Sequence, residues 1–156
     1  MSRDIRHASI PGSLQRMAKR LKFLIVEDEC ISRTLLKEML TPFGECHTAT
    51  NGDDAVDVLR HSYDEPGSQY DVVCLDIMMP GKNGHDVLKE LRKIETNKGI
   101  RGVNATKVFM VTALDDSKNI MEAMVEGRCQ AYLTKPVSRM KLEEQLRTLH
   151  LIEQCC

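Results

Sequence analysis

The 156-residue chain contains no long apolar run, and this absence excludes two classes of protein. No segment approaches the roughly 20 consecutive apolar residues that a membrane-spanning helix requires. The N-terminus also lacks the apolar block of about 7–15 residues that precedes the cleavage site of a secretory signal. We therefore expect a cytoplasmic protein. The content of 42% apolar and 29% charged residues is typical of a globular protein with one hydrophobic core.

Cysteine pairs with C-x-x-C spacing are also missing, although the chain has six cysteines in all. Cys30, Cys46, Cys74 and Cys129 are scattered and form no C-x-x-C pair of the kind found in metal sites or redox motifs. Reduced thiols are therefore expected. The pair Cys155–Cys156 at the C-terminus could crosslink two chains or carry a lipid, but unpaired thiols are the simpler interpretation.

Aromatic residues are scarce, at 4% of the chain, and none interrupts the basic N-terminal segment. Residues 1–22 hold six Lys and Arg residues and one Asp, a net charge of +5, which leaves −6 for residues 23–156. A basic segment can bind nucleic acid or an anionic surface. Without interleaved aromatic residues, a solvated extension is the more frequent case, and we do not expect nucleic-acid binding.

From residue 21 onward, short β-branched runs alternate with longer segments of helical periodicity. This alternation is the signature of βαβ units and of a parallel sheet covered on both faces. It predicts an α/β fold, a doubly wound (βα)5 sandwich with a five-stranded parallel sheet and a short N-terminal extension. The expected strands are 22–26, 46–49, 70–75, 107–111 and 130–133, and the expected helices are 30–42, 52–61, 84–95, 116–126 and 138–150.

Two of these helices have clear apolar stripes, which we interpret as core residues. The stripes are Ile31, Leu35, Leu36, Met39 and Leu40 in the first helix, and Val87, Leu88, Leu91 and Ile94 in the third. Glycines indicate the turns between elements. Gly44 suits a turn after the first helix, and Gly81 and Gly84 bracket the segment after Asp76, where a tight turn or a close approach of the backbone is expected.

Polar side chains stand at the ends of four predicted strands. Glu27 and Asp28 follow the first strand, Asp76 follows the third, Thr112 follows the fourth, and Lys135 comes shortly after the fifth. In an open parallel sheet, ligands bind beyond the carboxyl ends of the strands, at the point where the strand order reverses. We therefore expect an acid cluster, a hydroxyl and an ammonium to meet there.

A cluster of Glu27, Asp28 and Asp76 would cost several kcal/mol in desolvation and repulsion unless protons or a divalent cation relieve it. Ligands that are all oxygen favour Mg²⁺, which typically keeps water and phosphate oxygens in its remaining positions. Asp76 is then the natural nucleophile of an in-line phosphoryl transfer. Mg²⁺, the Lys135 ammonium and the Thr112 hydroxyl could neutralise the oxygens of the transferred group.

These residues lie in motifs that resemble the receiver domains of two-component response regulators, over about residues 21–150. The motifs are V-E-D-E at 26–29, L-D-I-M-M-P-G-K-N-G at 75–84, V-T-A at 111–113 and Y-L-T-K-P at 132–136. The resemblance implies a flavodoxin-like arrangement of the sheet and a phosphoacceptor role for Asp76. It also implies that Asp28, Asp76 and the backbone carbonyl of Met78 bind Mg²⁺, with Glu27 acting through water.

The resemblance further implies a switch. Thr112 and Lys135 would contact the phosphoryl oxygens and move on phosphorylation, and Tyr132 would rotate into the space that Thr112 leaves. The Lys135–Pro136 bond would be cis, and residues 116–150 would present the altered face. Two departures from the family pattern are Glu27, where an Asp is frequent, and the turn 80–84, which has no acid before its glycine.

The residues beside the site suggest how long a phosphoryl group would last. Met78 and Leu114 are apolar and cannot orient an attacking water, so the sequence predicts slow hydrolysis of the phosphorylated protein. Residues 1–20 and 151–156, which flank the receiver-like segment 21–150, are too short for an output domain. We therefore expect a stand-alone receiver that acts as a switch rather than an enzyme, although it catalyses its own phosphorylation and dephosphorylation.

The expected phosphoryl donor is a phosphohistidine on a histidine kinase or a histidine phosphotransfer protein, and output is expected through protein contacts. The sequence leaves open whether the chain is a phosphorelay intermediate, a chemotaxis-like messenger or a kinase-bound regulator. One alternative is a constitutive receiver-like interaction module. A Mg²⁺-dependent aspartyl-phosphate hydrolase of the haloacid dehalogenase type is disfavoured, because its D-x-D-x-T motif would need an acid at Met78. A flavodoxin-like nucleotide-binding module is disfavoured because the acids after the first strand would repel phosphate.

Overall fold

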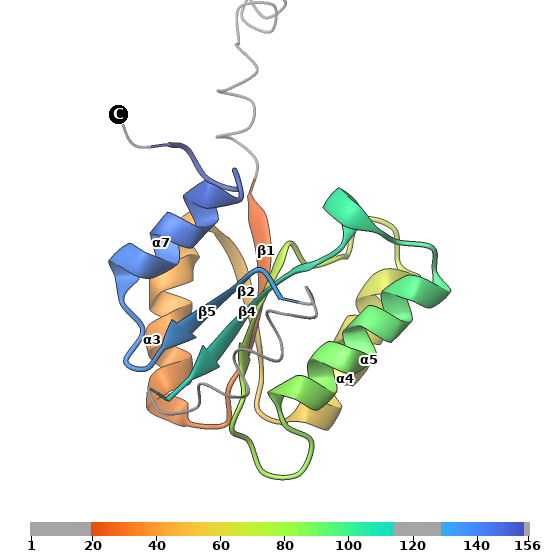
Figure 1. Cartoon of the computed structure of the whole chain (residues 1–156), viewed down its shortest axis with the longest axis horizontal. Coiled ribbons are helices and arrows are strands. Elements are labelled where there is room, and N and C mark those ends of the chain that lie inside the picture. The colour runs from red at the N-terminus through yellow and green to blue at the C-terminus, as the bar shows by residue number, and fades with distance from the viewer. Residues whose placement is uncertain (1–19, 114–128, 155–156) are drawn as a thin grey trace, which may run out of the picture.

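Five parallel strands form one sheet in the computed structural model, which describes residues 20–113 and 129–154 (Figure 1). The strand order is β2-β1-β3-β4-β5. The strands are β1 (Leu21–Val26), β2 (Gly44–Ala49), β3 (Val72–Asp76), β4 (Lys107–Thr112) and β5 (Ala131–Thr134). All five expected strands are thus confirmed, with small shifts in their bounds. The shifts matter at β3 and β4, because Asp76 and Thr112 are the last residues of these strands.

Helices cover both faces of the sheet (Figure 1). The described helices are α3 (Cys30–Leu40), α4 (Gly52–Asp64), α5 (Gly84–Asn97) and α7 (Arg139–Thr148), with short 3-10 turns at Thr41–Phe43 and Gly102–Asn104. α3 and α7 pack on one face, and α4 and α5 pack on the other. The expected helix at 116–126 lies outside the described residues. None of the described helices has the length and apolar character needed to cross a bilayer.

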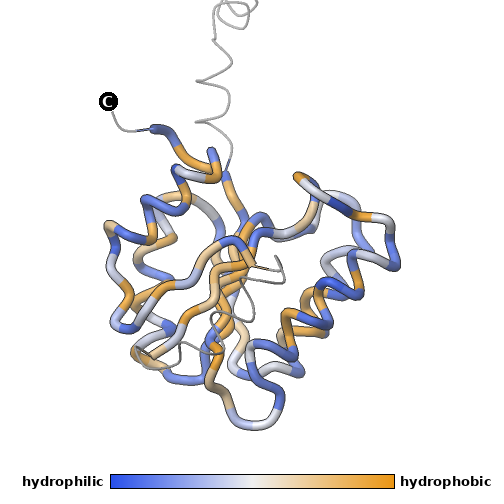
Figure 2. Tube along the Cα trace, in the orientation of Figure 1, coloured by the Kyte–Doolittle hydropathy of each residue, from blue (hydrophilic) through white to orange (hydrophobic). Residues whose placement is uncertain are grey.

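The core has two halves because successive side chains of a strand point to opposite faces of the sheet. In β1, Leu24 and Val26 face α4 and α5, whereas Phe23 and Ile25 face α3 and α7. β3 is buried throughout, as expected for a central parallel strand. Figure 2 shows the hydrophobic residues concentrated on the strands and on the inner sides of the helices. The doubly wound α/β fold expected from the sequence is confirmed.

The apolar stripe of α3 is wider than the surface that the sheet can cover. Leu36 and Leu40 are buried, but Ile31 and Leu35 are 68% and 46% exposed. The prediction that Ile31 and Leu35 are core residues is therefore wrong. Residues four apart share one side of a helix, so 36 and 40 form one row and 31 and 35 form a neighbouring row. Only the first row faces the sheet and α7.

The connection from α5 to β4 is held by a buried carboxylate, that of Glu95. Its Oε2 accepts hydrogen bonds from the Tyr63 hydroxyl at 2.5 Å and the Thr106 amide at 2.7 Å, and its Oε1 pairs with Arg92 at 2.7 Å. Burial, together with the hydrogen bond to Glu95, raises the pKa of Tyr63 well above its usual range. The loop is thus fixed at the end of the sheet away from the carboxyl ends of the strands.

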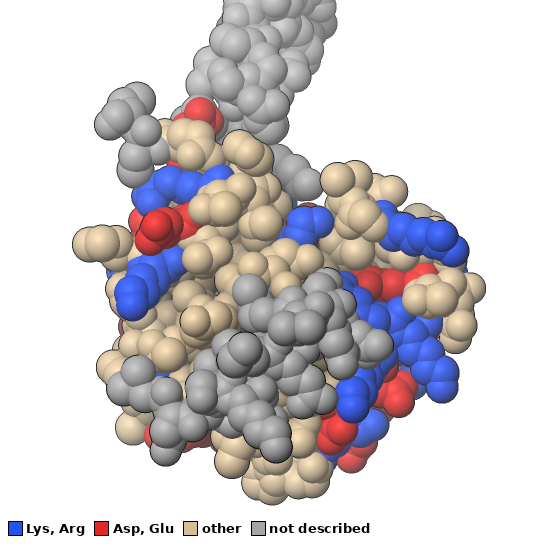
Figure 3. All heavy atoms as spheres, in the orientation of Figure 1, with Lys and Arg blue, Asp and Glu red and all other residues tan. Residues whose placement is uncertain are grey.

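The outer surface of α4 and α5 carries side chains of both charges, which interleave on the face shown in Figure 3. Arg60 lies 3.9 Å from Glu90 across the two helices, and Lys98 lies 2.8 Å from Asp64 near their ends. Exposed pairs of this kind each contribute at most about 1 kcal/mol to stability. Their alternation prevents this face from acting as a surface of a single charge.

Candidate functional site

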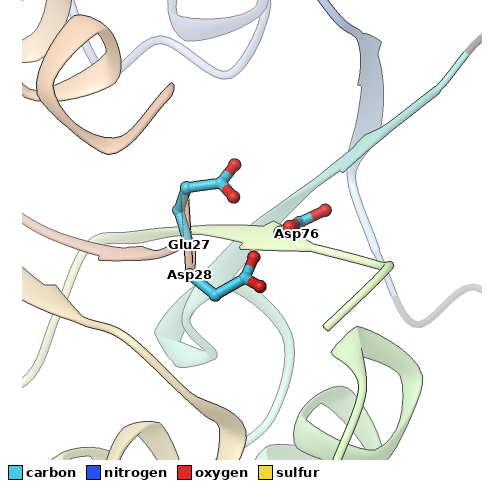
Figure 4. A group of neighbouring side chains, drawn as sticks. All are labelled: Glu27, Asp28 and Asp76. Atoms are coloured by element: carbon cyan, nitrogen blue, oxygen red, sulfur yellow. The ribbon is translucent and has the colours of Figure 1, made fainter. Parts of the chain in front are cut away.

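Three acidic side chains meet at the carboxyl ends of β1 and β3, which are neighbours in the sheet. Figure 4 shows the carboxylates of Glu27 and Asp28, which follow β1, directed to the same side as Asp76 at the end of β3. One oxygen of each lies within 4.8 Å of the others. The chain passes from β1 to β2 on one side and then to β3 on the other, so the cluster lies at the reversal of strand order.

Burial differs among the three acids. Glu27 and Asp76 are buried, whereas Asp28 is exposed to solvent. The pKa of Asp76 is raised from 3.8 to about 7, first by burial and then by the hydrogen bond to Glu27 and the negative charge of Glu27. The positive charge of Lys135 and the Met78 amide oppose the rise. Asp76 is therefore a carboxyl group whose proton is released near neutral pH when no cation is bound.

Lys135, just after β5, bridges the two buried carboxylates. Its Nζ lies 2.9 Å from Glu27 Oε1 and 3.4 Å from Asp76 Oδ2. Burial by itself lowers the pKa of Lys135, but the hydrogen bond to Glu27 and the negative charge of Asp76 outweigh it, so the pKa lies above its usual value. The ammonium is therefore charged at neutral pH. The Lys135–Pro136 bond is cis, as expected.

Main-chain amides engage the other oxygen of each buried carboxylate. The Glu29 amide donates to Glu27 Oε2 at 3.2 Å, and the Met78 amide donates to Asp76 Oδ1 at 3.2 Å. Three carboxylates nevertheless outnumber the single ammonium of Lys135. This oxygen-only donor set, two of whose members are buried, fits a hard divalent cation such as Mg²⁺.

Thr112 and Tyr132 lie on the strands beside the acid cluster. Thr112 is buried at the end of β4, where its carbonyl accepts a hydrogen bond from the Lys135 amide at 2.8 Å and its hydroxyl donates to the Ala113 carbonyl at 3.2 Å. Tyr132, on β5, is 45% exposed. Met78 is exposed in the loop after Asp76. Leu114 lies outside the described residues.

Glycines shape the loop that follows Asp76. Gly81 has a φ of 73°, a conformation that favours glycine. A Cβ on Gly84 would lie 2.5 Å from the carbonyl oxygen of Asp76, because the start of α5 packs directly against the end of β3. Both glycines that were expected to bracket this turn are therefore needed, one for its dihedral angle and the other for close approach. Gly44, as expected, ends the turn after the first helix, because it caps the 3-10 turn Thr41–Phe43, and it also begins β2.

Arg33 is a residue of the site that sequence reasoning missed. It lies in α3, and its Nη1 donates to the carbonyl of Glu27 at 3.1 Å and to that of Asp28 at 3.4 Å. The guanidinium therefore holds the loop that carries two of the acids. A signal was available, because a basic residue in the turn after three consecutive acids can fold back onto their loop.

The described cysteines are consistent with the absence of close spacing in the sequence. Cys30, Cys46 and Cys74 are free thiols. Burial raises the pKa of the Cys74 thiol to about 12, so this residue behaves as a small core side chain. Cys155–Cys156 lies outside the described residues.

The fold is that of an α/β protein, and its acid cluster lies at the switch point of the sheet, where α/β proteins bind their ligands. The family model of the response regulator receiver domain matches residues 23–147. The chain is 33% identical over 132 residues to chemotaxis protein CheY of Thermotoga maritima, covering 83% of this chain and 96% of that protein. The chain therefore belongs to the response regulator receiver domain family.

Other relatives are longer. The chain is 33% identical over 129 residues to the probable transcriptional regulator ycf27 of Porphyra purpurea, but spans only 46% of its length. The receiver domain of the histidine kinase CKI1 from Arabidopsis thaliana, complexed with Mg²⁺ and BeF3⁻, superposes with a TM-score of 0.71 at 25% identity, covering 90% of this chain and 96% of that one.

A further structural relative comes from a complex. It is the co-crystal structure of the Saccharomyces cerevisiae histidine phosphotransfer signalling protein Ypd1 with the receiver domain of its downstream response regulator Ssk1. The match has a TM-score of 0.67 and 27% identity, and it covers 81% of this chain and 86% of that one.

Proposed function

We propose that this chain is a signalling switch that accepts a phosphoryl group on Asp76 from a phosphohistidine. Membership of the receiver family gives the class, a module of two-component signal transduction. The observation that carries the choice of residue is the position of Asp76, at the end of a central strand, within the acid cluster and 3.4 Å from the Lys135 ammonium. No other carboxylate is proposed as the acceptor.

In the proposed transfer, an oxygen of Asp76 attacks phosphorus while the bond between phosphorus and the imidazole nitrogen of the donor breaks. The electron pair of that bond stays with the nitrogen, and the phosphoryl group becomes an acyl phosphate on Asp76. Asp28, Asp76 and the Met78 carbonyl would hold Mg²⁺, with Glu27 acting through water. When bound, Mg²⁺ neutralises charge on the oxygens of the transferred group.

The residues around Asp76 would then stabilise the phosphorylated form. Lys135 would pair with one phosphoryl oxygen and the Thr112 hydroxyl would donate to another. Movement of Thr112 would allow Tyr132, which is half exposed on β5, to turn inward. We propose that residues 116–150 transmit this change to a downstream protein. Part of that range lies outside the described residues.

The donor would be a histidine kinase or a histidine phosphotransfer protein, a partner class supported by the Ypd1 complex of the similar Ssk1 receiver. Such a donor must cover the surface around Asp76. Exposed apolar side chains lie on the neighbouring elements, at Ile31 and Leu35 of α3 and Met140 of α7. Leu35 also lines a cavity of about 70 Å³ beside Pro136. We propose that this apolar rim is where the donor packs.

We also propose a division of the chain into three segments. We divide it into a basic extension at 1–20, the receiver at 21–150 and a tail at 151–156. The protein would act as a switch that assists its own phosphorylation and dephosphorylation, rather than as an enzyme with a separate substrate. A cytoplasmic location agrees with the free thiols of Cys30, Cys46 and Cys74.

Incubation with a small phosphodonor, with and without Mg²⁺, tests the proposal. We expect the intact mass of the wild-type protein to rise by one phosphoryl group only when Mg²⁺ is present. The Asp76→Asn variant, which keeps the shape of the side chain, should show no gain. A folded wild-type protein that gains nothing would instead support a constitutive interaction module that has the receiver fold without its phosphorylation.

A further inference from the structure

The start of α4 contacts both loops that carry the acid cluster. On one side, the Glu27 amide donates to the carbonyl of Ala49, the last residue of β2, at 3.1 Å. On the other side, Gly52, the first residue of α4, is buried against Lys82 in the loop between β3 and α5. The segment from Ala49 to Gly52 therefore supports the loop after β1 and the loop after β3 at the same time.

The contact at Gly52 leaves no room for a side chain. A Cβ on Gly52 would overlap the carbonyl oxygen of Lys82 and would lie 2.7 Å and 2.9 Å from its Cβ and Cγ. Gly52 does not have a positive φ, so glycine is needed here for space and not for its dihedral angle. The side chain of Lys82 is 28% exposed, and its ammonium lies 3.6 Å from Oδ1 of Asp53, the next residue of α4. Since the nearest atom belongs to the backbone, a larger residue at position 52 must displace the loop or the start of α4.

A displacement at Lys82 would be absorbed by the part of the loop that carries Met78. Both ends of the loop are fixed, because the Ile77 amide donates to a carbonyl of β4 at 2.9 Å and the side chain of Asn83 caps α5. The Met78 amide donates to Asp76 Oδ1 at 3.2 Å, and the Met78 carbonyl is the proposed metal ligand. The position of both groups therefore depends on how the loop rests on α4.

We propose that Gly52 is a positioning residue of the metal site, because its missing side chain sets how closely the loop of Met78 approaches the loop of Asp28. Gly52 is not itself a ligand and acts through Lys82. Mg²⁺ demands near-ideal octahedral geometry, and a functional group generally has to be held within about 0.5 Å of its productive position. A shift of the Met78 carbonyl would therefore weaken binding even though every ligand is still present. This inference rests on the proposed Mg²⁺ site at Asp28, Asp76 and the Met78 carbonyl.

Calorimetric titration with Mg²⁺ alone tests this role through binding rather than activity. We expect Gly52→Ala to weaken Mg²⁺ binding about tenfold, the lower end of the range for residues that support metal ligands. Gly44→Ala is the matched control, because a Cβ on Gly44 would also overlap a backbone oxygen, that of Leu21, at the starts of β1 and β2 and away from the acid cluster. This control should lower stability and change the affinity by less than about twofold. Circular dichroism establishes that each variant is folded before titration.

The outcomes separate this inference from the proposed function. If folded wild-type protein binds no Mg²⁺, the proposed metal site is refuted, and this inference with it. If the wild-type protein binds Mg²⁺ and Gly52→Ala binds it equally well, only the positioning role of Gly52 is overturned. Equal weakening in Gly52→Ala and Gly44→Ala would overturn that role as well, because the loss would then follow stability rather than the position of the loop.

Hydrogen exchange of the wild-type protein keeps the inference testable if the variants do not fold. Coupling is reciprocal, so a segment that positions a metal ligand is itself held in place when the metal binds. We expect Mg²⁺ to slow amide exchange severalfold in peptides from residues 50–56, at the start of α4, relative to peptides from residues 57–64 of the same helix. The second half of α4 corrects for any general gain in stability. Equal slowing of the two halves, or no slowing, in protein that binds Mg²⁺ would overturn the proposal.

Discussion

At the scale of single residues, the site is dominated by negative charge that the fold buries. Glu27 and Asp76 lose most of their contact with water, and Lys135 compensates for only part of their charge. This imbalance explains why Asp76 has a raised pKa and why the cluster suits a divalent cation. The same uncompensated charges favour the binding of a divalent cation, which our proposal requires.

The raised pKa of Asp76 has a consequence for stability. Its pKa rises from 3.8 to about 7 on folding, so between these values the folded state binds more protons than the unfolded state. The contribution of this group is therefore fully present below about pH 4 and is lost as pH rises through 7. With chelator present, we expect wild-type stability to fall more from pH 5 to pH 8 than that of Asp76→Asn. Urea unfolding at both pH values measures this, and equal falls would contradict it.

Arg33 gives a prediction about metal affinity. Its guanidinium donates to the carbonyls of Glu27 and Asp28, and each lost hydrogen bond costs about 1 kcal/mol. We expect Arg33→Ala to weaken Mg²⁺ binding by about tenfold, since a freer loop no longer positions Asp28. Lys37→Ala, at an exposed position on the same helix, is the matched control. Calorimetry that finds equal affinity for the two variants would count against this role for Arg33.

Met78 gives a prediction about the lifetime of the phosphoryl group. Its side chain is exposed beside Asp76 and has no polar atom that could orient an attacking water. We expect Met78→Asn to shorten the half-life of the phosphorylated protein severalfold, because an amide can hold a water near phosphorus. Phosphate release after removal of the donor measures the rate. Met78→Leu should behave as wild type, and rapid loss from the wild-type protein would contradict the expectation.

The sequence predicted part of this site and missed the rest for physical reasons. Glu27, Asp28 and Asp76 could be grouped because parallel strands end at one edge of a sheet. The shorter distance of Lys135 to Glu27 than to Asp76 could not be predicted, since it depends on the lengths and rotamers of the side chains. Arg33 was missed because helical periodicity only assigns residues to faces of the helix. The signal that points to Arg33 is its position one turn after the three consecutive acids.

At the scale of secondary structure elements, α3 has two apolar rows with different roles. Leu36 belongs to the buried row and Leu35 to the exposed one. We expect Leu36→Ala to destabilise the protein by about 2–5 kcal/mol, as for other buried leucines. Leu35→Ala should cost much less stability and should slow phosphotransfer from a histidine-containing donor protein, while phosphorylation by a small phosphodonor is unchanged.

Leu36→Ala and Leu35→Ala serve as controls for each other, because one should change stability and the other should change the docking of the donor protein. Urea unfolding measures the stability difference, and the rates with protein and small donors measure docking. If Leu35→Ala slows both donors equally, the exposed row does not contact the donor protein. The sequence could not separate the rows, because both satisfy helical spacing and only the position of the sheet and α7 decides which is covered.

At the scale of the whole molecule, alternating strand and helix patterns were enough to predict the doubly wound sheet. The pattern works because β1 and β3 are apolar on both faces and the helices have one buried side each. The buried network of Glu95, Tyr63 and Thr106 was not predicted, since such residues on helices and loops usually lie at the surface. It holds the loop before β4, at the end of the sheet away from the site.

The central claim is that Asp76 becomes an acyl phosphate, and borohydride reduction tests it most directly. This reagent converts an aspartyl phosphate to homoserine, so the modified residue is identified by peptide mass spectrometry. We expect homoserine at position 76, and only after incubation with both phosphodonor and Mg²⁺. Conversion at another carboxylate, or none in folded protein that has bound Mg²⁺, would contradict the account.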